Sequence, residues 1–130
     1  GWDINRVNFG GRARDSDAFV NRAAEMWYET ARLIEKQELI LMDDEVLMAQ
    51  LTSRRCRANK AGKMELETKG EMKSRGLSSP DRADAVCMAV AMGSDHDYMD
   101  TYVRPSIEEM FEGVEIPDGY ESTTHGIHCG

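Results

Sequence analysis

Two aspartates three residues apart are the part of this sequence best suited to chemistry. Asp81 and Asp84 fall in the run at residues 79–84, and a spacing of three places them on neighbouring parts of one helical face. Asp81 stands where the helix dipole favours negative charge, so helix capping explains it. Asp84 has apolar neighbours, and an unpaired carboxylate buried among them is costly. A divalent cation or Arg82 would offset that cost, so Asp84 is either a metal ligand or a capping or ion-paired residue.

Two helices are expected to position these side chains. Ser79, Pro80 and Asp81 supply a cap, a proline at the first helical position and an acid in the first turn, which mark a helix start, and Gly93 ends the pattern. A longer helix is predicted after the N-cap candidates at residues 15–17, because apolar residues recur there at steps of three and four. Its expected inner face consists of Phe19, Ala23, Met26, Trp27, Ala31 and Ile34.

Shorter elements complete the predicted α/β chain. Residues 4–9 alternate partly and precede two glycines, which favours a strand and a turn. Residues 38–41 form an edge strand or a connector, and Asp43 or Asp44 caps a second helix. Residues 54–58 and 62–67 flank a turn-prone stretch and predict a hairpin. Residues 94–130 are expected to be a tail with at most a short helix around residues 107–111.

Charge is strongly segregated along the chain. The net charge of -8 argues against a simple nucleic-acid binder. Residues 54–75, however, hold 8 basic and 3 acidic residues, a balance of +5, whereas residues 94–130 hold 1 basic and 9 acidic residues, a balance of -8. The basic stretch is either a surface that tracks a DNA backbone or a solvated face that balances the acidic remainder. The candidate DNA-binding residues are Arg54, Arg55, Arg57, Lys60, Lys63, Lys69 and Lys73.

The remaining candidates for chemistry are weak. Cys56, Cys87 and Cys129 form an odd, widely spaced set, which fits a reducing compartment better than a disulfide framework. His125, His128 and Cys129 lack the paired spacing of a zinc site. No apolar run approaches the roughly 20 residues that a membrane helix needs, so no membrane partner is expected.

Five segments of the sequence resemble the C-terminal end of a tailed-phage terminase large subunit. They are residues 62–69, residues 72–76, residues 79–85 with their serine-proline-aspartate-x-alanine-aspartate-alanine pattern, and the earlier residues 7–11 and 21–27. The similarity covers roughly residues 2–93 in order. It implies an incomplete ribonuclease H-like nuclease domain over residues 1–93, consisting of a long helix, short strands or a hairpin and a C-terminal helix, followed by an acidic tail over residues 94–130.

The resemblance also implies an activity. Such nucleases cut concatemeric viral DNA during genome packaging by metal-assisted phosphodiester hydrolysis, with two Mg²⁺ or Mn²⁺ ions about 4 Å apart. The family's last metal-binding acid falls on Asp84. The resemblance implies that Asp81, three residues earlier on the same helix, assists it. The first two acids and the ATPase half would precede Gly1. One carboxylate cannot hold two metals, so this chain alone is expected to cleave little or nothing.

Partners and alternatives follow from the same resemblance. The implied partners are double-stranded DNA, the remainder of the large subunit, the small terminase subunit and the portal or procapsid, met in the host cytoplasm during virion assembly. A non-catalytic module that docks on the portal or procapsid through residues 94–130 is the first alternative. Another ribonuclease H-like nuclease, such as a junction resolvase, is the second, because those enzymes also carry a late acidic pair on a helix.

Overall fold

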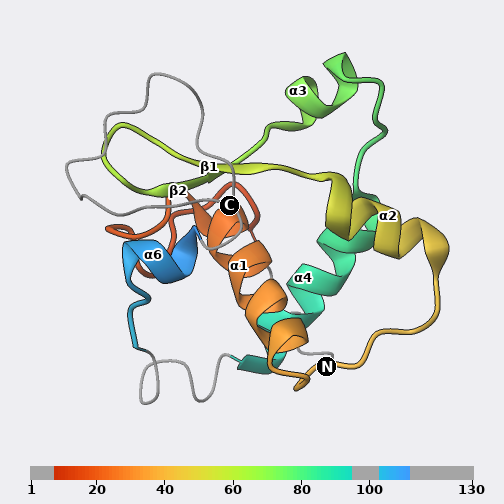
Figure 1. The fold of residues 1–130 in the computed structure, drawn as a ribbon, viewed down its shortest axis with the longest axis horizontal. Helices are drawn as coiled ribbons and strands as arrows, with labels where there is room; N and C mark the ends of the chain where they lie inside the picture. Colours follow the sequence, from red (N-terminus) through yellow and green to blue (C-terminus); the bar gives the residue numbers. More distant parts are fainter. Residues whose placement is uncertain (1–7, 95–102, 112–130) are drawn as a thin grey trace, which may run out of the picture.

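Two long helices cross at the centre of the structure (Figure 1). The computed structural model describes residues 8–94 and 103–111. Helices α1 (Arg22–Glu35) and α4 (Asp81–Ser94) pack against each other, and α2 (Glu45–Ser53) packs on α4. Strands β1 (Cys56–Ala58) and β2 (Met64–Leu66) form a two-stranded antiparallel hairpin whose second strand contacts α1. The described chain is therefore broadly α/β, and no described helix is long and apolar enough to cross a membrane.

Helix α1 begins at Arg22, several residues later than predicted. Its N-cap is Asn21, whose side-chain oxygen accepts a hydrogen bond from the Ala24 amide at 2.9 Å. The segment before it pairs with β2 instead: Val20 N donates to the Met64 carbonyl at 3.0 Å, and Met64 N donates to Ala18 at 2.8 Å. Backbone groups bonded to a strand are not available to a helix. The N-cap prediction at residues 15–17 was therefore wrong.

The inner face of α1 also differs from the predicted stripe. Met26 and Trp27 are buried as expected, but Ala31 is exposed and Ile34 is 37% exposed. Thr30 is buried in their place and satisfies its hydroxyl by donating to the Met26 carbonyl at 2.9 Å. A polar side chain that is hydrogen-bonded within its own helix costs little free energy to bury. A prediction based on apolar residues alone therefore chose the wrong residues for the second half of the buried face.

Several short elements confirm the sequence predictions. Asp44 caps α2 by accepting from the Val46 and Leu47 amides, both at 3.0 Å. The hairpin forms around a turn in which Gly62 has a φ of 80°, a left-handed conformation that suits glycine. Helix α4 begins at Asp81, directly after Pro80.

The two short segments considered as strands do not form strands in the described residues. Residues 38–41 form a connector. Residues 8–11 form a turn, and the rest of the predicted first strand lies outside the described residues.

Helix α3 (Lys69–Ser74) follows the hairpin and was not predicted. Thr68 and Glu71 form a capping box: each side chain accepts a hydrogen bond from the other residue's backbone amide. The helix leads into the loop that carries the chain to α4 (Figure 1). Helix α3 matters for the site described below because its first residue, Lys69, forms an ion pair with Asp84.

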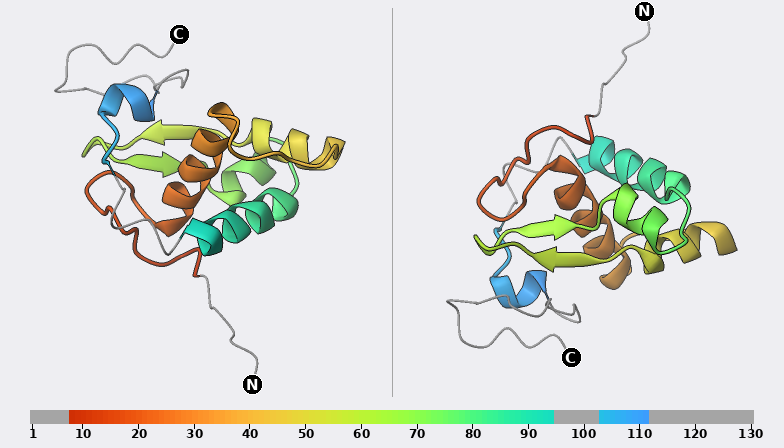
Figure 2. Two further views of the ribbon diagram at one scale, coloured as in Figure 1. Left: turned by 90° about the horizontal axis from the view of Figure 1, so that it is seen from below. Right: turned by 90° about the horizontal axis from the view of Figure 1, so that it is seen from above.

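The short helix α6 (Ile107–Met110) confirms the expected helix near residue 107. It lies beside the hairpin, on the side away from α4 (Figure 2). Met110 and Phe111 are buried in the same core as α1 and β2. Arg104 ties this segment to the loop before α1, with ion pairs to Asp15 at 2.8 Å and Asp17 at 3.2 Å. Residues 103–111 thus belong to the packed structure, which the sequence did not predict.

Candidate functional site

Asp84 lies in the first turn of α4 with its side chain directed into the protein. The residue is 5% exposed. Its Oδ1 atom accepts a hydrogen bond from Trp27 Nε1 at 3.0 Å and lies 3.4 Å from Arg54 Nη1. Its Oδ2 atom lies 2.9 Å from Lys69 Nζ. Four segments far apart in the sequence therefore meet at one carboxylate.

Arg54 is the buried cation of this cluster. It caps the C-terminus of α2, and its side chain is only 7% exposed. Its Nε atom donates to the Glu67 carbonyl at 3.0 Å, and its guanidinium carbon lies 4.9 Å from the centre of the Trp27 ring. Burial lowers the pKa of Arg54, and the charge of Asp84 opposes that shift. The pair is therefore a buried ion pair within a hydrogen-bonded network.

Arg82 does not compensate Asp84, contrary to the sequence expectation. Its guanidinium instead holds the Asp44 carboxylate, with Nη1–oxygen distances of 2.9 and 2.8 Å. The backbone amides of Arg82 and Ala83 both donate to Gln50 Oε1, at 2.9 and 3.0 Å. Hydrogen bonds from the Leu47 amide and the charge of Arg82 lower the pKa of Asp44. Side chains of α2 and its cap therefore hold the start of α4.

Asp81 occupies a different environment from Asp84. It is exposed, and its Oδ1 atom accepts a hydrogen bond from the Ser79 hydroxyl at 2.7 Å. Among the described contacts, none joins it to Asp84. This placement favours the capping interpretation of Asp81 over a direct part in chemistry at the Asp84 carboxylate.

Asp84 is the one carboxylate in its cluster with Trp27, Arg54 and Lys69. Within residues 8–94 and 103–111, no group of three or more His, Cys, Asp or Glu side chains could hold a metal ion. His125, His128 and Cys129 lie outside this part of the chain. Asp84 Oδ2 is a hard oxygen donor of the kind that Mg²⁺ and Mn²⁺ prefer, but in this structure it is paired with Lys69 Nζ at 2.9 Å. Cys87 is a poor nucleophile, because burial raises its pKa to about 11.

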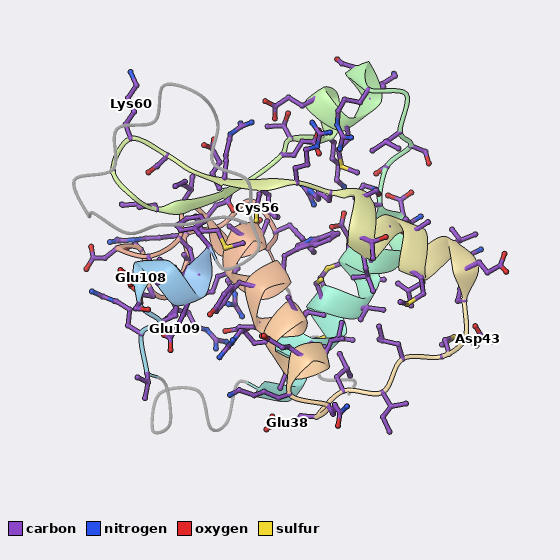
Figure 3. The ribbon with its side chains drawn as sticks, in the orientation of Figure 1. Glu38, Asp43, Cys56, Lys60, Glu108 and Glu109 are labelled. Atoms are coloured by element: carbon purple, nitrogen blue, oxygen red, sulfur yellow. The ribbon has the colours of Figure 1, made fainter. Side chains whose placement is uncertain are left out.

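The predicted DNA-binding residues divide into two groups. Arg54 and Lys69 pair with Asp84, and Arg57 pairs with Glu71 at 2.8 Å and Glu65 at 3.4 Å. In the described part of the chain, the other members form no salt bridge. These free cations are Arg55, Lys60, Lys63 and Lys73. Figure 3 shows Lys60 at the tip of the hairpin loop, directed away from the body of the protein.

The Arg57–Glu71 pair predicts a specific pH dependence. Hydrogen bonds from Arg57 and from the Thr68 backbone lower the pKa of Glu71 from 4.5 to about 2. A carboxylate whose pKa is lowered by folding stabilises the fold fully above its ordinary pKa and loses that contribution as the pH falls toward the lowered value. We expect urea midpoints of wild type and Glu71→Gln to differ at pH 6 and to converge between pH 4.5 and about 2. A difference that persists unchanged at pH 2 would contradict this, and Glu38→Gln on the exposed connector is the control.

Glu25 is a buried acid that the sequence reasoning missed. It is fully buried, and its two carboxylate oxygens accept from the backbone amides of Arg14 at 2.9 Å and Asp15 at 2.8 Å. Arg22 donates to the same carboxylate at 2.5 Å. Glu25 therefore fastens the loop at residues 8–20 to α1. Glu25 lies in the first turn of α1, but the helix was predicted to start at residues 15–17, and the partners of Glu25 could not be predicted from the sequence.

The chain was also compared with known proteins. No protein-family model, no curated protein and no solved structure matches it.

Proposed function

We propose that this chain is the C-terminal portion of a ribonuclease H-like nuclease domain from a tailed-phage terminase large subunit. The observation that supports it most directly is the origin of the side chains around Asp84. Trp27 and Lys69 both contact Asp84, and these three residues come from three different segments among those that carry the resemblance.

In the proposed enzyme, Asp84 is the last acidic ligand of a divalent-metal site. The bound ions would supply an activated water and stabilise the leaving oxygen of the cleaved phosphodiester. Asp84 presents a fixed oxygen toward them, and Trp27 and Arg54 hold the other oxygen within the core. The further acids and the ATPase half belong to the remainder of the large subunit, so the 130-residue chain is expected to be inactive alone. The proposed setting is the host cytoplasm during virion assembly.

The ion pairs of Asp84 weigh against this assignment and define its test. A carboxylate already compensated by Arg54 and Lys69 gives up Coulombic stabilisation when a metal replaces either cation. Lys69 is the partner that can be displaced at low cost, because its side chain is 55% exposed, whereas the Arg54 side chain is 7% exposed. A metal is therefore expected at Oδ2, on the Lys69 side.

Metal binding by the complete large subunit tests the proposal. We expect Asp84→Asn to weaken Mn²⁺ binding at least about 10-fold, because it removes a charged oxygen ligand while keeping the size of the side chain. Asp81→Asn is the matched control and should change the affinity little, since Asp81 lies exposed against Ser79. Electron paramagnetic resonance of free Mn²⁺ measures both. Equal affinities of wild type and Asp84→Asn would leave Asp84 with a structural ion pair only.

The free cations on the hairpin and α3 are the proposed contacts to the DNA backbone. Arg55, Lys60, Lys63 and Lys73 are exposed or half-buried and form no described salt bridge. We expect Lys60→Gln to reduce the slope of log K against log salt by about one in magnitude, as loss of one phosphate contact does. Lys36→Gln, which removes an equal charge beyond the end of α1, should leave the slope unchanged. Equal slopes for wild type and Lys60→Gln would support the solvated-face interpretation.

Docking on a portal or procapsid is the second candidate function. Figure 3 shows Glu108 and Glu109 on α6, and both residues are exposed while Met110 and Phe111 hold the helix in the core. An acidic face is thus presented on an anchored element. Neutralising this face with Glu108→Gln and Glu109→Gln should weaken capture by purified portal if docking uses it, without changing Mn²⁺ affinity. Unchanged capture would exclude this face.

A further inference from the structure

The free cations of the hairpin and α3 form no salt bridge within the described residues. They are Arg55, Lys60, Lys63 and Lys73, of which three are exposed and Lys63 is half-buried. Their neighbour Arg75 differs, because its guanidinium holds the buried Glu67 carboxylate at 2.6 Å. The free cations are therefore available to an anionic group from outside the described part of the chain.

Residues 112–130, here called the acidic segment, carry the opposite charge and lie outside the described residues. Their acidic residues are Glu112, Glu115, Asp118 and Glu121, and they contain no Lys or Arg. At physiological ionic strength, opposite charges attract each other over a Debye length of about 8 Å. The acidic segment is thus complementary in charge to the free cations.

The structure fixes the point from which the acidic segment starts. Phe111, the residue before it, is fully buried in the same core as Ala58 and Met64 of the hairpin. Both views of Figure 2 show α6, which ends at Met110, beside the hairpin. A segment of this length spans up to roughly 60 Å when extended, well beyond the radius of gyration of about 13 Å of a 100-residue domain. Its carboxylates can therefore reach the free cations, and the tether at Phe111 raises their effective concentration to roughly the millimolar range.

We propose that the acidic segment binds the free cations of its own chain and there competes with the phosphates of DNA. The competition rests on the proposed function, because it requires these cations to contact DNA, whereas the contact within the chain does not. Exposed ion pairs are individually weak. The acidic segment therefore lowers the affinity for DNA without abolishing it, and a duplex with its many phosphates displaces it.

Cross-linking of the 130-residue chain without DNA tests the contact itself. A water-soluble carbodiimide joins a carboxylate to a lysine amine that touches it. At a salt concentration of about 20 mM we expect the monomer to contain Lys60, Lys63 or Lys73 joined to an acid of residues 112–121, and at about 0.5 M salt we expect this product to be lost. Lys36 is the internal control, because it is exposed beyond the end of α1 and its neighbours Glu35 and Glu38 are acidic. Cross-links to Lys36 as frequent as those to the hairpin and α3, or none to the hairpin and α3, would overturn the inference.

Neutralising the acidic segment tests the competition. We expect the triple variant Glu115→Gln, Asp118→Asn, Glu121→Gln to bind a duplex of about 30 base pairs at least about 3-fold more tightly than wild type at low salt, and the difference to disappear at high salt. The matched control Glu38→Gln, Asp43→Asn, Glu45→Gln removes the same charge from exposed positions on the connector and α2 and should change the affinity less than about 1.5-fold. Figure 3 shows Glu38 and Asp43 far from Lys60.

The outcomes separate this inference from the function on which it rests. If wild type binds the duplex and the neutralised acidic segment leaves its affinity unchanged, the competition is overturned, while the proposed DNA contacts stand. If both triple variants gain affinity equally, only the net charge matters and the inference is overturned as well. If wild type binds no DNA, the proposed contacts fail and the competition fails with them, whatever the cross-links show. Salt-sensitive cross-links together with a gain confined to the acidic segment support the inference.

Discussion

Replacing Asp84 by alanine is expected to destabilise the chain by about 3–5 kcal/mol, the cost of removing one partner of a buried ion pair. The variant leaves the Arg54 guanidinium buried with its main counter-charge gone, and the Trp27 N–H without its acceptor. The free energy of unfolding from urea denaturation measures the effect. The loss arises from an uncompensated charge rather than from lost packing, so it should be much larger than the size of the deleted group suggests.

Two comparisons identify the cause of that loss. Asp81→Ala should change stability by less than about 0.5–1 kcal/mol, because the deleted carboxylate is exposed and bonded locally to Ser79. The double variant Asp84→Ala, Arg54→Met should recover part of the loss, since it removes the orphaned charge along with its partner. A cost for Asp84→Ala no greater than that for Asp81→Ala would show that the cluster is not compensated as described.

Replacing Phe111 by alanine is expected to cost about 3–5 kcal/mol, the usual range for a fully buried phenylalanine. Phe111 is fully buried and joins the core formed by α1 and the hairpin. Val103→Ala is the matched control in the same segment, because Val103 is 84% exposed, and it should change stability by less than about 0.5 kcal/mol. Thermal unfolding of both variants distinguishes a packed segment from a tail.

A Phe111→Ala variant as stable as Val103→Ala would restore the tail interpretation of this segment. If instead the large loss is observed, a docking experiment on the C-terminal residues must retain residues 103–111. A truncation after Gly93 removes Phe111 and Met110 from the core, and lost binding would then reflect lost stability. Point substitutions at exposed Glu108 and Glu109 avoid that ambiguity.

Local signals in the sequence predicted the elements whose causes are local. The hairpin depends on a turn around Gly62, and α2 on a cap at Asp44, so both are encoded within a few residues. The start of α4 follows from Pro80 and Asp81 in the same way. Burial of Asp84 among apolar neighbours was also readable, because its flanking residues define an inward face. These local signals were enough to predict a broadly α/β chain.

The remainder depends on contacts between distant residues. Trp27 was predicted as a core anchor, but its donor reaches a carboxylate 57 residues further on, which no periodicity encodes. The delayed start of α1 results from pairing between residues 18–20 and β2, and the burial of Phe111 results from docking on the hairpin side of the core. A divalent cation or Arg82, two residues away, was predicted to compensate Asp84, whereas the fold brings Arg54 and Lys69 to it. Charge compensation is chosen by the tertiary structure, not by sequence proximity.

The cap on α4 has a mechanical consequence. Gln50 of α2 accepts hydrogen bonds from the amides of Arg82 and Ala83, and Asp44 pairs with Arg82, so the first turn of α4 is bonded directly to α2 and its cap. A shift of α2 relative to the core would therefore be expected to move the first turn of α4, and the Asp84 carboxylate with it.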